Sequence, residues 1–204
     1  MSNKNHWNNV YRTKSEDAVS WYAAHLDTSL RMIQHVAPMP EAAIIDVGGG
    51  EATLADDLLA LGYRDLTVLD ISETAIQAMR ERLGTKSASV EWLVTDVTTA
   101  TLPSARYDVW HDRAVFHFLT DPADRQAYIA QATQSVKADG FLVVATFGPD
   151  GPLKCSGLDT VRYDAAALQA EFGAGFALMD STVESHQTPF GTSQQFVYCL
   201  FNRK

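Results

Sequence analysis

Residues 43–50 read Ala-Ile-Ile-Asp-Val-Gly-Gly-Gly, so a short and mostly apolar run leads directly into three glycines. Such a run predicts a buried central strand, because strands covered on both faces lack polar alternation. Leu54 and Leu58 follow at helical spacing, and this helix is expected to end near Gly62. The segment therefore predicts a strand, a tight glycine turn and a helix.

The same alternation continues after this segment. Further strands are expected at residues 66–69, 90–94, 107–110 and 141–147. Helices are expected between them: Ser72 is placed to cap one, and Asp121-Pro122 to begin another that ends at Gly140. Strands that alternate with helices predict a mostly parallel sheet covered by helices.

The chain is expected to end in a different arrangement. The runs at residues 176–184 and 195–201 are separated by only ten residues (185–194), which is too few for a helical crossover. An antiparallel hairpin should therefore close the sheet. We expect an α/β fold, a Rossmann-like doubly wound sheet of five parallel strands plus this hairpin. It should occupy residues 41–204, with residues 1–40 as a helical and aromatic cap.

Composition narrows the class of protein. The 204 residues are 46% apolar and 20% charged, which is typical of a single globular domain. The 16 basic residues face 25 acidic ones, and this net charge of −9 disfavours nucleic acid or an anionic membrane as a partner. No apolar stretch approaches about 18 residues, so no span is expected. Cys155 and Cys199 form neither a zinc motif nor a disulfide framework. We expect a cytoplasmic protein with no metal.

Carboxylates stand at the ends of three predicted strands. Asp46, Asp70 and Asp96 lie at or beside the ends of the first, second and third strands. Because ligands of open α/β sheets bind at the carboxyl ends of the strands, these side chains should meet at one site. An aspartate 22 residues after Gly48 is placed to accept both hydroxyls of a ribose.

The glycine turn narrows the ligand further. Gly48 and Gly50 let the backbone turn tightly and let a ligand approach without a Cβ in the way. Glu51 stands where the pyrophosphate of a dinucleotide would lie, and its charge would repel a phosphate. The implied ligand is a nucleoside that carries a cation and no phosphate.

Residues 45–52, 69–72 and 95–97 resemble the first three motifs of class I S-adenosylmethionine-dependent methyltransferases. The resemblance implies that Asp46 and Gly48 hold the methionine part of this cofactor, Asp70 the ribose, and Asp96 with Val97 the adenine. Ala52 stands where a third glycine is frequent, which leaves the loop geometry open. The predicted cofactor-binding residues are Trp7, Tyr11, Trp21, Asp46, Gly48, Gly50, Asp70, Ile71, Asp96, Val97 and His111.

A closer resemblance concerns residues 6–11, 20–22 and 110–119. They are similar to a group of small bacterial methyltransferases and to eukaryotic enzymes that methylate lysines of citrate synthase and elongation factor. The resemblance implies methyl transfer to a nitrogen, with a protein lysine as the leading acceptor, and Asp112 at the position of an acidic residue. The signature of nucleic-acid amino methyltransferases is absent, because residues 112–115 read Asp-Arg-Ala-Val.

An ammonium must lose a proton before its nitrogen can attack, which gives a role to a nearby base. The predicted catalytic residues are Asp112, His111 and His117. Each has an alternative: His117 as a core histidine, His111 as a hydrogen-bonding partner of the loop or cofactor, and Asp112 as an ion-pair partner of Arg113. Trp7, among the N-terminal aromatic residues, either faces the sulfonium or packs the segment onto the domain.

Three other functions stay open. The acceptor can be a small-molecule thiol, amine or carboxylate instead of a lysine. The protein can be a non-catalytic sensor that binds the cofactor, or a nicotinamide-dependent oxidoreductase, which Glu51 and the missing third glycine disfavour.

Overall fold

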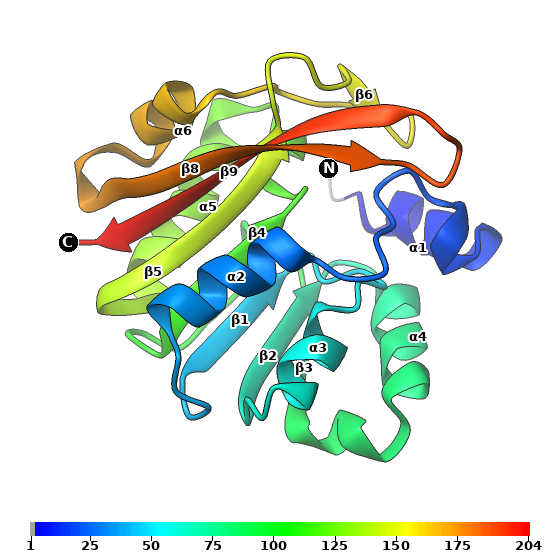
Figure 1. Cartoon of the computed structure of the whole chain (residues 1–204), viewed down its shortest axis with the longest axis horizontal. Helices are drawn as coiled ribbons and strands as arrows, with labels where there is room; N and C mark the ends of the chain where they lie inside the picture. The colour runs from blue at the N-terminus through cyan, green and yellow to red at the C-terminus, as the bar shows by residue number, and fades with distance from the viewer. Residues whose placement is uncertain (1–2) are drawn as a thin grey trace.

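The computed structural model describes residues 3–204. A seven-stranded sheet has the order β3-β2-β1-β4-β5-β9-β8, and a short two-stranded sheet pairs β6 with β7 (Figure 1). The strands are β1 (Ala43–Val47), β2 (Asp65–Asp70), β3 (Val90–Val94), β4 (Tyr107–Arg113), β5 (Val136–Phe147), β6 (Lys154–Cys155), β7 (Leu158–Asp159), β8 (Phe176–Gln187) and β9 (Ser193–Arg203). The α-helices are α1 (Lys4–Thr13), α2 (Asp27–Val36), α3 (Leu54–Ala60), α4 (Glu73–Leu83), α5 (Pro122–Ser135) and α6 (Ala165–Phe172). The 3₁₀ helices are η1 (Glu16–Ala18), η2 (Gly84–Ser89), η3 (Phe116–Phe118) and η4 (Gly173–Gly175).

The predicted sheet is confirmed. Strands β1 to β5 pair in parallel, and β9 pairs antiparallel with both β5 and β8. Strand order reverses between β1 and β4, and this is the point at which open α/β sheets bind their ligands.

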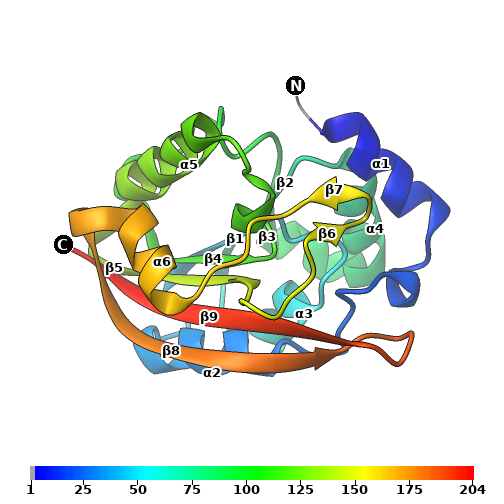
Figure 2. The ribbon, with the colours of Figure 1, turned by 90° about the horizontal axis from the view of Figure 1, so that it is seen from above.

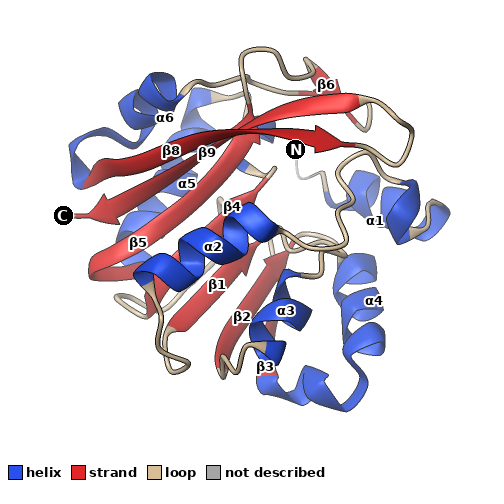
Figure 3. Cartoon of the chain, in the orientation of Figure 1, coloured by secondary structure: helices blue, strands red, loops and turns tan. Residues whose placement is uncertain are grey.

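The two faces of the sheet have separate cores, because neighbouring residues of a strand point to opposite faces. On β1, Ile44 packs with residues of α2, α3 and α4, whereas Ile45 packs with residues of α5 and α6. Figure 3 shows these helices in blue against the strands in red. Both core residues are buried, as expected for a central strand.

Two of the predicted helix starts agree with the structure. Ser72 caps α4 by accepting a hydrogen bond from the Ala75 amide, and Asp121 caps α5 by accepting one from the Ala123 amide. The prediction that the latter helix continues to Gly140 is wrong. The helix ends at Ser135 and β5 begins at once, with Val136 paired to Tyr107 of β4. Val136 is β-branched and fully buried, and such residues pack well in a strand.

The two helices before β1 lie in different parts of the fold. Helix α2 lies on the sheet and contributes Met32 and Ile33 to its core. Helix α1 lies outside the sheet and packs against α4, as Figure 2 shows from above. The boundary at residue 40 between a cap and a domain stays a prediction, and α1 with η1 is the part that stands apart from the sheet. No helix among residues 3–204 is long and apolar enough to cross a membrane.

Candidate active site

A cavity of about 520 Å³ lies at the carboxyl ends of β1 to β4, within the usual range for ligand sites. The structure brings to it every residue predicted to bind the cofactor: Trp7, Tyr11, Trp21, Asp46, Gly48, Gly50, Asp70, Ile71, Asp96, Val97 and His111. Asp112 and His117 do not line it. Among residues 3–204, no group of three or more His, Cys, Asp or Glu side chains could hold a metal ion.

The glycine turn after β1 forms one wall of the cavity. Gly48 and Gly50 have φ values of +69° and +56°, which favour glycine. A Cβ on Gly48 would collide with the side chain of Val115, and a Cβ on Gly50 would stand 2.5 Å from the Tyr11 hydroxyl. Both positions therefore require glycine for conformation and for space.

Asp70 ends β2 and lies beneath this turn. Its Oδ2 accepts a hydrogen bond from the Gly50 amide at 2.8 Å, and its Oδ1 accepts one from the Ser72 amide at 2.7 Å. Burial raises the pKa of Asp70 to about 6, although these amides oppose the rise. Each carboxylate oxygen keeps a lone pair for another donor, as two vicinal hydroxyls would require.

Asp96 follows β3. Its Oδ1 accepts hydrogen bonds from the amide and the hydroxyl of Thr98, at 3.0 and 2.7 Å. These bonds fix the carboxylate beside Val97 at the rim of the cavity. The position suits the polar edge and the ring of a base.

Asp46, His111 and Ser29 form a buried chain below the cavity. Asp46 Oδ1 lies 2.7 Å from His111 Nδ1, and His111 Nε2 lies 2.8 Å from Ser29 Oγ. Both ring nitrogens of His111 are thus engaged, so the ring orients Asp46. Asp46 Oδ2 is buried and has no hydrogen-bond partner among residues 3–204. A buried carboxylate oxygen without a donor fits an ammonium group of a ligand.

The other two predicted catalytic residues lie away from the cavity. Asp112 is fully buried, and its carboxylate accepts hydrogen bonds from the amides of Val115 and Phe116 and from the Tyr128 hydroxyl at 2.6 Å. His117 is also fully buried, and its Nδ1 accepts a hydrogen bond from the Phe147 amide. Burial, with the charge of a nearby arginine, lowers the pKa of His117 to about 3. This geometry gives no support to proton transfer by either residue.

Four aromatic rings form another wall of the cavity, next to the glycine turn. The ring centroid of Trp7 lies 5.1 Å from Phe118, 5.9 Å from Trp21 and 6.1 Å from Tyr11. Three of these rings come from residues before β1, whereas Phe118 belongs to η3. Sequence reasoning did not assign Phe118 to the site, although it lies in the motif at residues 110–119. Aromatic faces attract cations, so this wall suits a positively charged ligand.

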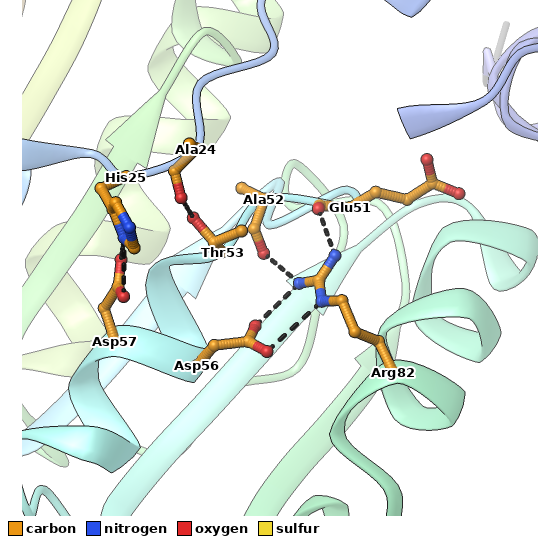
Figure 4. A network of polar contacts seen from close by, with 8 residues as sticks. All are labelled: Ala24, His25, Glu51, Ala52, Thr53, Asp56, Asp57 and Arg82. Atoms are coloured by element: carbon orange, nitrogen blue, oxygen red, sulfur yellow. Dashed lines mark hydrogen bonds and ion pairs between the residues drawn. The ribbon is translucent and has the colours of Figure 1, made fainter. Parts of the chain in front are cut away.

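The turn is held by contacts that no motif revealed. Arg82 of α4 donates hydrogen bonds to the carbonyl oxygens of Glu51 and Ala52, each at 2.7 Å. The hydroxyl of Thr53 donates to the carbonyl of Ala24 at 2.8 Å (Figure 4). Figure 4 also shows the side chain of Glu51 directed away from Arg82. The loop after the glycines is therefore tied both to α4 and to the segment before α2.

Comparisons with known proteins indicate a methyltransferase domain. Residues 44–140 match the family model for a methyltransferase domain. The eEF1A lysine and N-terminal methyltransferase of Mus musculus is 29% identical over 117 residues, which are 57% of this chain and 16% of that protein. The matched part thus spans about a sixth of that relative's length.

Two solved structures resemble the chain over almost its whole length. One comes from a study of the conversion of a disulfide bond into a thioacetal group during echinomycin biosynthesis. It has a TM-score of 0.81 and 18% identity, and it covers 100% of this chain and 92% of its own. The other is 1,6-didemethyltoxoflavin-N1-methyltransferase of Burkholderia thailandensis with bound 1,6-didemethyltoxoflavin and S-adenosylhomocysteine. It has a TM-score of 0.71 and 17% identity, with coverages of 99% and 84%. At these identities the likeness shows a shared fold.

Proposed function

Because residues 44–140 form a methyltransferase domain of the class I S-adenosylmethionine-dependent family, we propose that the protein transfers the methyl group of S-adenosylmethionine to a nitrogen atom of its acceptor. The family match and the similarity to a solved methyltransferase with bound S-adenosylhomocysteine support this activity and this cofactor. One observation carries the proposal: a single cavity holds the glycine turn, three strand-end carboxylates and an aromatic wall.

The residues of the cavity fit this cofactor. Asp70 would accept hydrogen bonds from the two ribose hydroxyls, and Asp96 with Val97 would contact the adenine. Asp46 Oδ2, buried and without a donor, would accept the amino group of the methionine part. When bound, the cofactor supplies an electrophilic methyl group on a positively charged sulfur.

The protein's own contribution is alignment and exclusion of water. In-line displacement at a sulfonium depends mainly on how the acceptor is oriented and desolvated. The rings of Trp7, Trp21 and Phe118 provide an apolar wall that tolerates positive charge.

Tyr11, Cys155 and His111 of the cavity offer little general-base chemistry to an amine. Burial raises the pKa values of the Tyr11 hydroxyl and the Cys155 thiol, so both stay protonated at neutral pH. His111 is engaged at both ring nitrogens. An amine acceptor would therefore attack in its neutral form, after giving its proton to water or to a carboxylate that lines the cavity.

Two acceptor classes have support from different observations. A protein lysine is supported by the similarity to the eEF1A lysine and N-terminal methyltransferase. A small molecule is supported by the toxoflavin-type N-methyltransferase, whose fold covers 99% of this chain. The net charge of −9 would attract a cationic lysine segment.

Binding of S-adenosylhomocysteine, followed by transfer from methyl-labelled S-adenosylmethionine in a cell extract, tests the proposal. We expect binding by calorimetry and label in a protein band or in a small-molecule fraction, which separates the two acceptor classes. Binding without label in any fraction would indicate a sensor. Affinity for NAD without affinity for S-adenosylhomocysteine would overturn the proposal.

A further inference from the structure

Arg113, the last residue of β4, is the only lysine or arginine that lines the cavity among residues 3–204. Its guanidinium is held in one orientation. Nε donates a hydrogen bond to the Tyr198 hydroxyl at 3.0 Å, and Nη1 donates one to the carbonyl oxygen of Trp21 at 3.0 Å. The group also lies over the ring of Phe196, with Cζ 4.5 Å from the centroid. Arg113 is thus pre-oriented, as a binding residue must be.

Among residues 3–204, the positive charge of Arg113 has no counterion within ion-pair distance. No carboxylate in the described part of the chain lies within 4.0 Å of its nitrogens, and Nη2 is buried without a hydrogen-bond partner. Removing a cation from water is costly unless an anion and hydrogen bonds compensate it. The ion pair with Asp112, which the sequence left open as an alternative, does not form, because Asp112 points to the opposite face of the sheet and contacts Tyr128.

Three neighbouring titratable groups, two histidines and a thiol, do not compensate this charge either. Burial first, and then the charge of Arg113, lower the pKa values of His117 and His186. Both histidines are therefore neutral at pH 7. The Cys155 thiol is protonated there, because burial raises its pKa.

We infer that Arg113 binds a carboxylate group of a molecule that occupies the cavity. This inference rests on the proposed function and narrows it. The carboxylate belongs either to the methionine part of the donor or to the acceptor, and both sources use the same guanidinium chemistry. The partners of Arg113 on β9 place it away from Asp70 and Asp96, which serve the ribose and the adenine. In the second case the acceptor carries an anionic group as well as the nitrogen that is methylated.

The test compares Arg113→Gln with Arg64→Gln, which removes an equal charge from an exposed position before β2. Calorimetry measures the affinity for S-adenosylhomocysteine and for 5′-methylthioadenosine, which lacks the amino-acid part. Benzoate, an aromatic carboxylate, is then titrated into protein saturated with S-adenosylhomocysteine, with benzamide as its neutral counterpart. Wild-type protein that does not bind S-adenosylhomocysteine would refute the proposed function itself.

Two results support the inference and identify the source. If the donor's carboxylate is bound, Arg113→Gln lowers the affinity for S-adenosylhomocysteine at least tenfold. The affinity for 5′-methylthioadenosine then stays unchanged. If the acceptor's carboxylate is bound, both nucleoside affinities persist, and the wild-type preference for benzoate over benzamide disappears in Arg113→Gln. Arg113→Lys keeps the charge and should retain part of either effect.

Other results overturn the inference. One such result is that Arg113→Gln and Arg64→Gln have equal affinities for all four compounds. The other is that Arg113→Gln loses affinity for both nucleosides by the same factor. The second result would mean that Arg113 only supports the fold. If Arg113→Gln does not fold, the same titrations of the wild-type protein and of Arg113→Lys still test the inference. Unchanged nucleoside affinities in Arg113→Lys together with equal wild-type binding of benzoate and benzamide would contradict an anion site.

Discussion

The hydroxyl of Tyr11 occupies the space that a side chain on Gly50 would need, 2.5 Å from the position of a Cβ. Helix α1 therefore contacts the glycine turn directly at the edge of the cavity. Asn8 of the same helix accepts a hydrogen bond from the Ser72 hydroxyl at 2.8 Å, which ties α1 to the start of α4. The closure of the cavity and the shape of the turn thus depend on each other.

Gly50→Ala tests this dependence. The new methyl group would displace Tyr11, and with it α1, so we expect the affinity for S-adenosylhomocysteine to fall at least tenfold. Gly84→Ala is a matched control, because Gly84 has the same φ of +56° and no atom within 4 Å of its Cβ position. Both variants should lose about 1–3 kcal/mol of stability to backbone strain, but only Gly50→Ala should lose affinity by calorimetry. Equal affinities in the two variants would refute the contact's role.

Asp70→Ala tests the ribose contact. Removing a charged acceptor from two hydroxyls should weaken cofactor binding by about 1–3 kcal/mol, or roughly 5- to 150-fold. Asp65→Ala, at the opposite end of β2, removes an equal charge and should leave the affinity unchanged. A folded Asp70→Ala protein with wild-type affinity would disprove the assignment.

Asp112→Ala separates a catalytic role from a structural one. The sequence alone suggests that Asp112 takes a proton from the amine acceptor, so that its replacement would slow turnover. Its placement leads to another expectation: the amides of Val115 and Phe116 lose their acceptor, and the free energy of unfolding falls by about 1–3 kcal/mol. Urea unfolding measures this loss, and calorimetry should show that cofactor affinity persists. Tyr128→Phe removes the hydrogen bond to Asp112 and also leaves the buried Trp110 Nε1 without its acceptor, so it should cost about 1–3 kcal/mol without slowing turnover. Slow turnover with unchanged stability would restore the catalytic role.

His117 should make the protein sensitive to mild acid. Its folded pKa of about 3 lies below the ordinary value of 6.5, so the unfolded chain binds the proton more tightly. This histidine's contribution to stability therefore falls as the pH drops through 6.5, by about 2 kcal/mol between pH 7.5 and 5. Urea unfolding at the two pH values should show that acid lowers the free energy of unfolding less in His117→Asn than in the wild type. His35→Asn, at an exposed position, serves as the control, and an acid loss in His117→Asn equal to that of the wild type would contradict the expectation.

The fold followed from local signals that agreed with one another. Apolar strands, caps such as Ser72 and terminal glycines each marked the same boundaries. The boundary before β5 was missed because Val136 continues the apolar stripe of α5. Only its pairing with Tyr107, which is remote in sequence, draws it into the strand.

The site was only partly predicted from the sequence, and the residues at the end of β4 show why. The sequence suggested a strand that ends at Trp110, whereas β4 continues through Arg113. Because side chains alternate along a strand, His111 and Arg113 face the cavity while Asp112 faces α5. Neighbouring residues of β4 thus have different surroundings. Which of them faces the cavity follows from the alternation only once the strand is known to continue through Arg113. Local patterns also could not reveal that Tyr198, from the far end of the chain, fixes Arg113.

The arginine's supports lie outside the part of the chain that matches the family model, since Trp21 precedes residue 44 and Tyr198 follows residue 140. The groups assigned to the donor, Asp46, Asp70 and Asp96, lie inside it. Mutations in the two flanking regions can therefore change how Arg113 is held while these three carboxylates stay as they are. The part of the ligand that meets Arg113 can thus vary between relatives independently of the contacts made by the strand-end carboxylates.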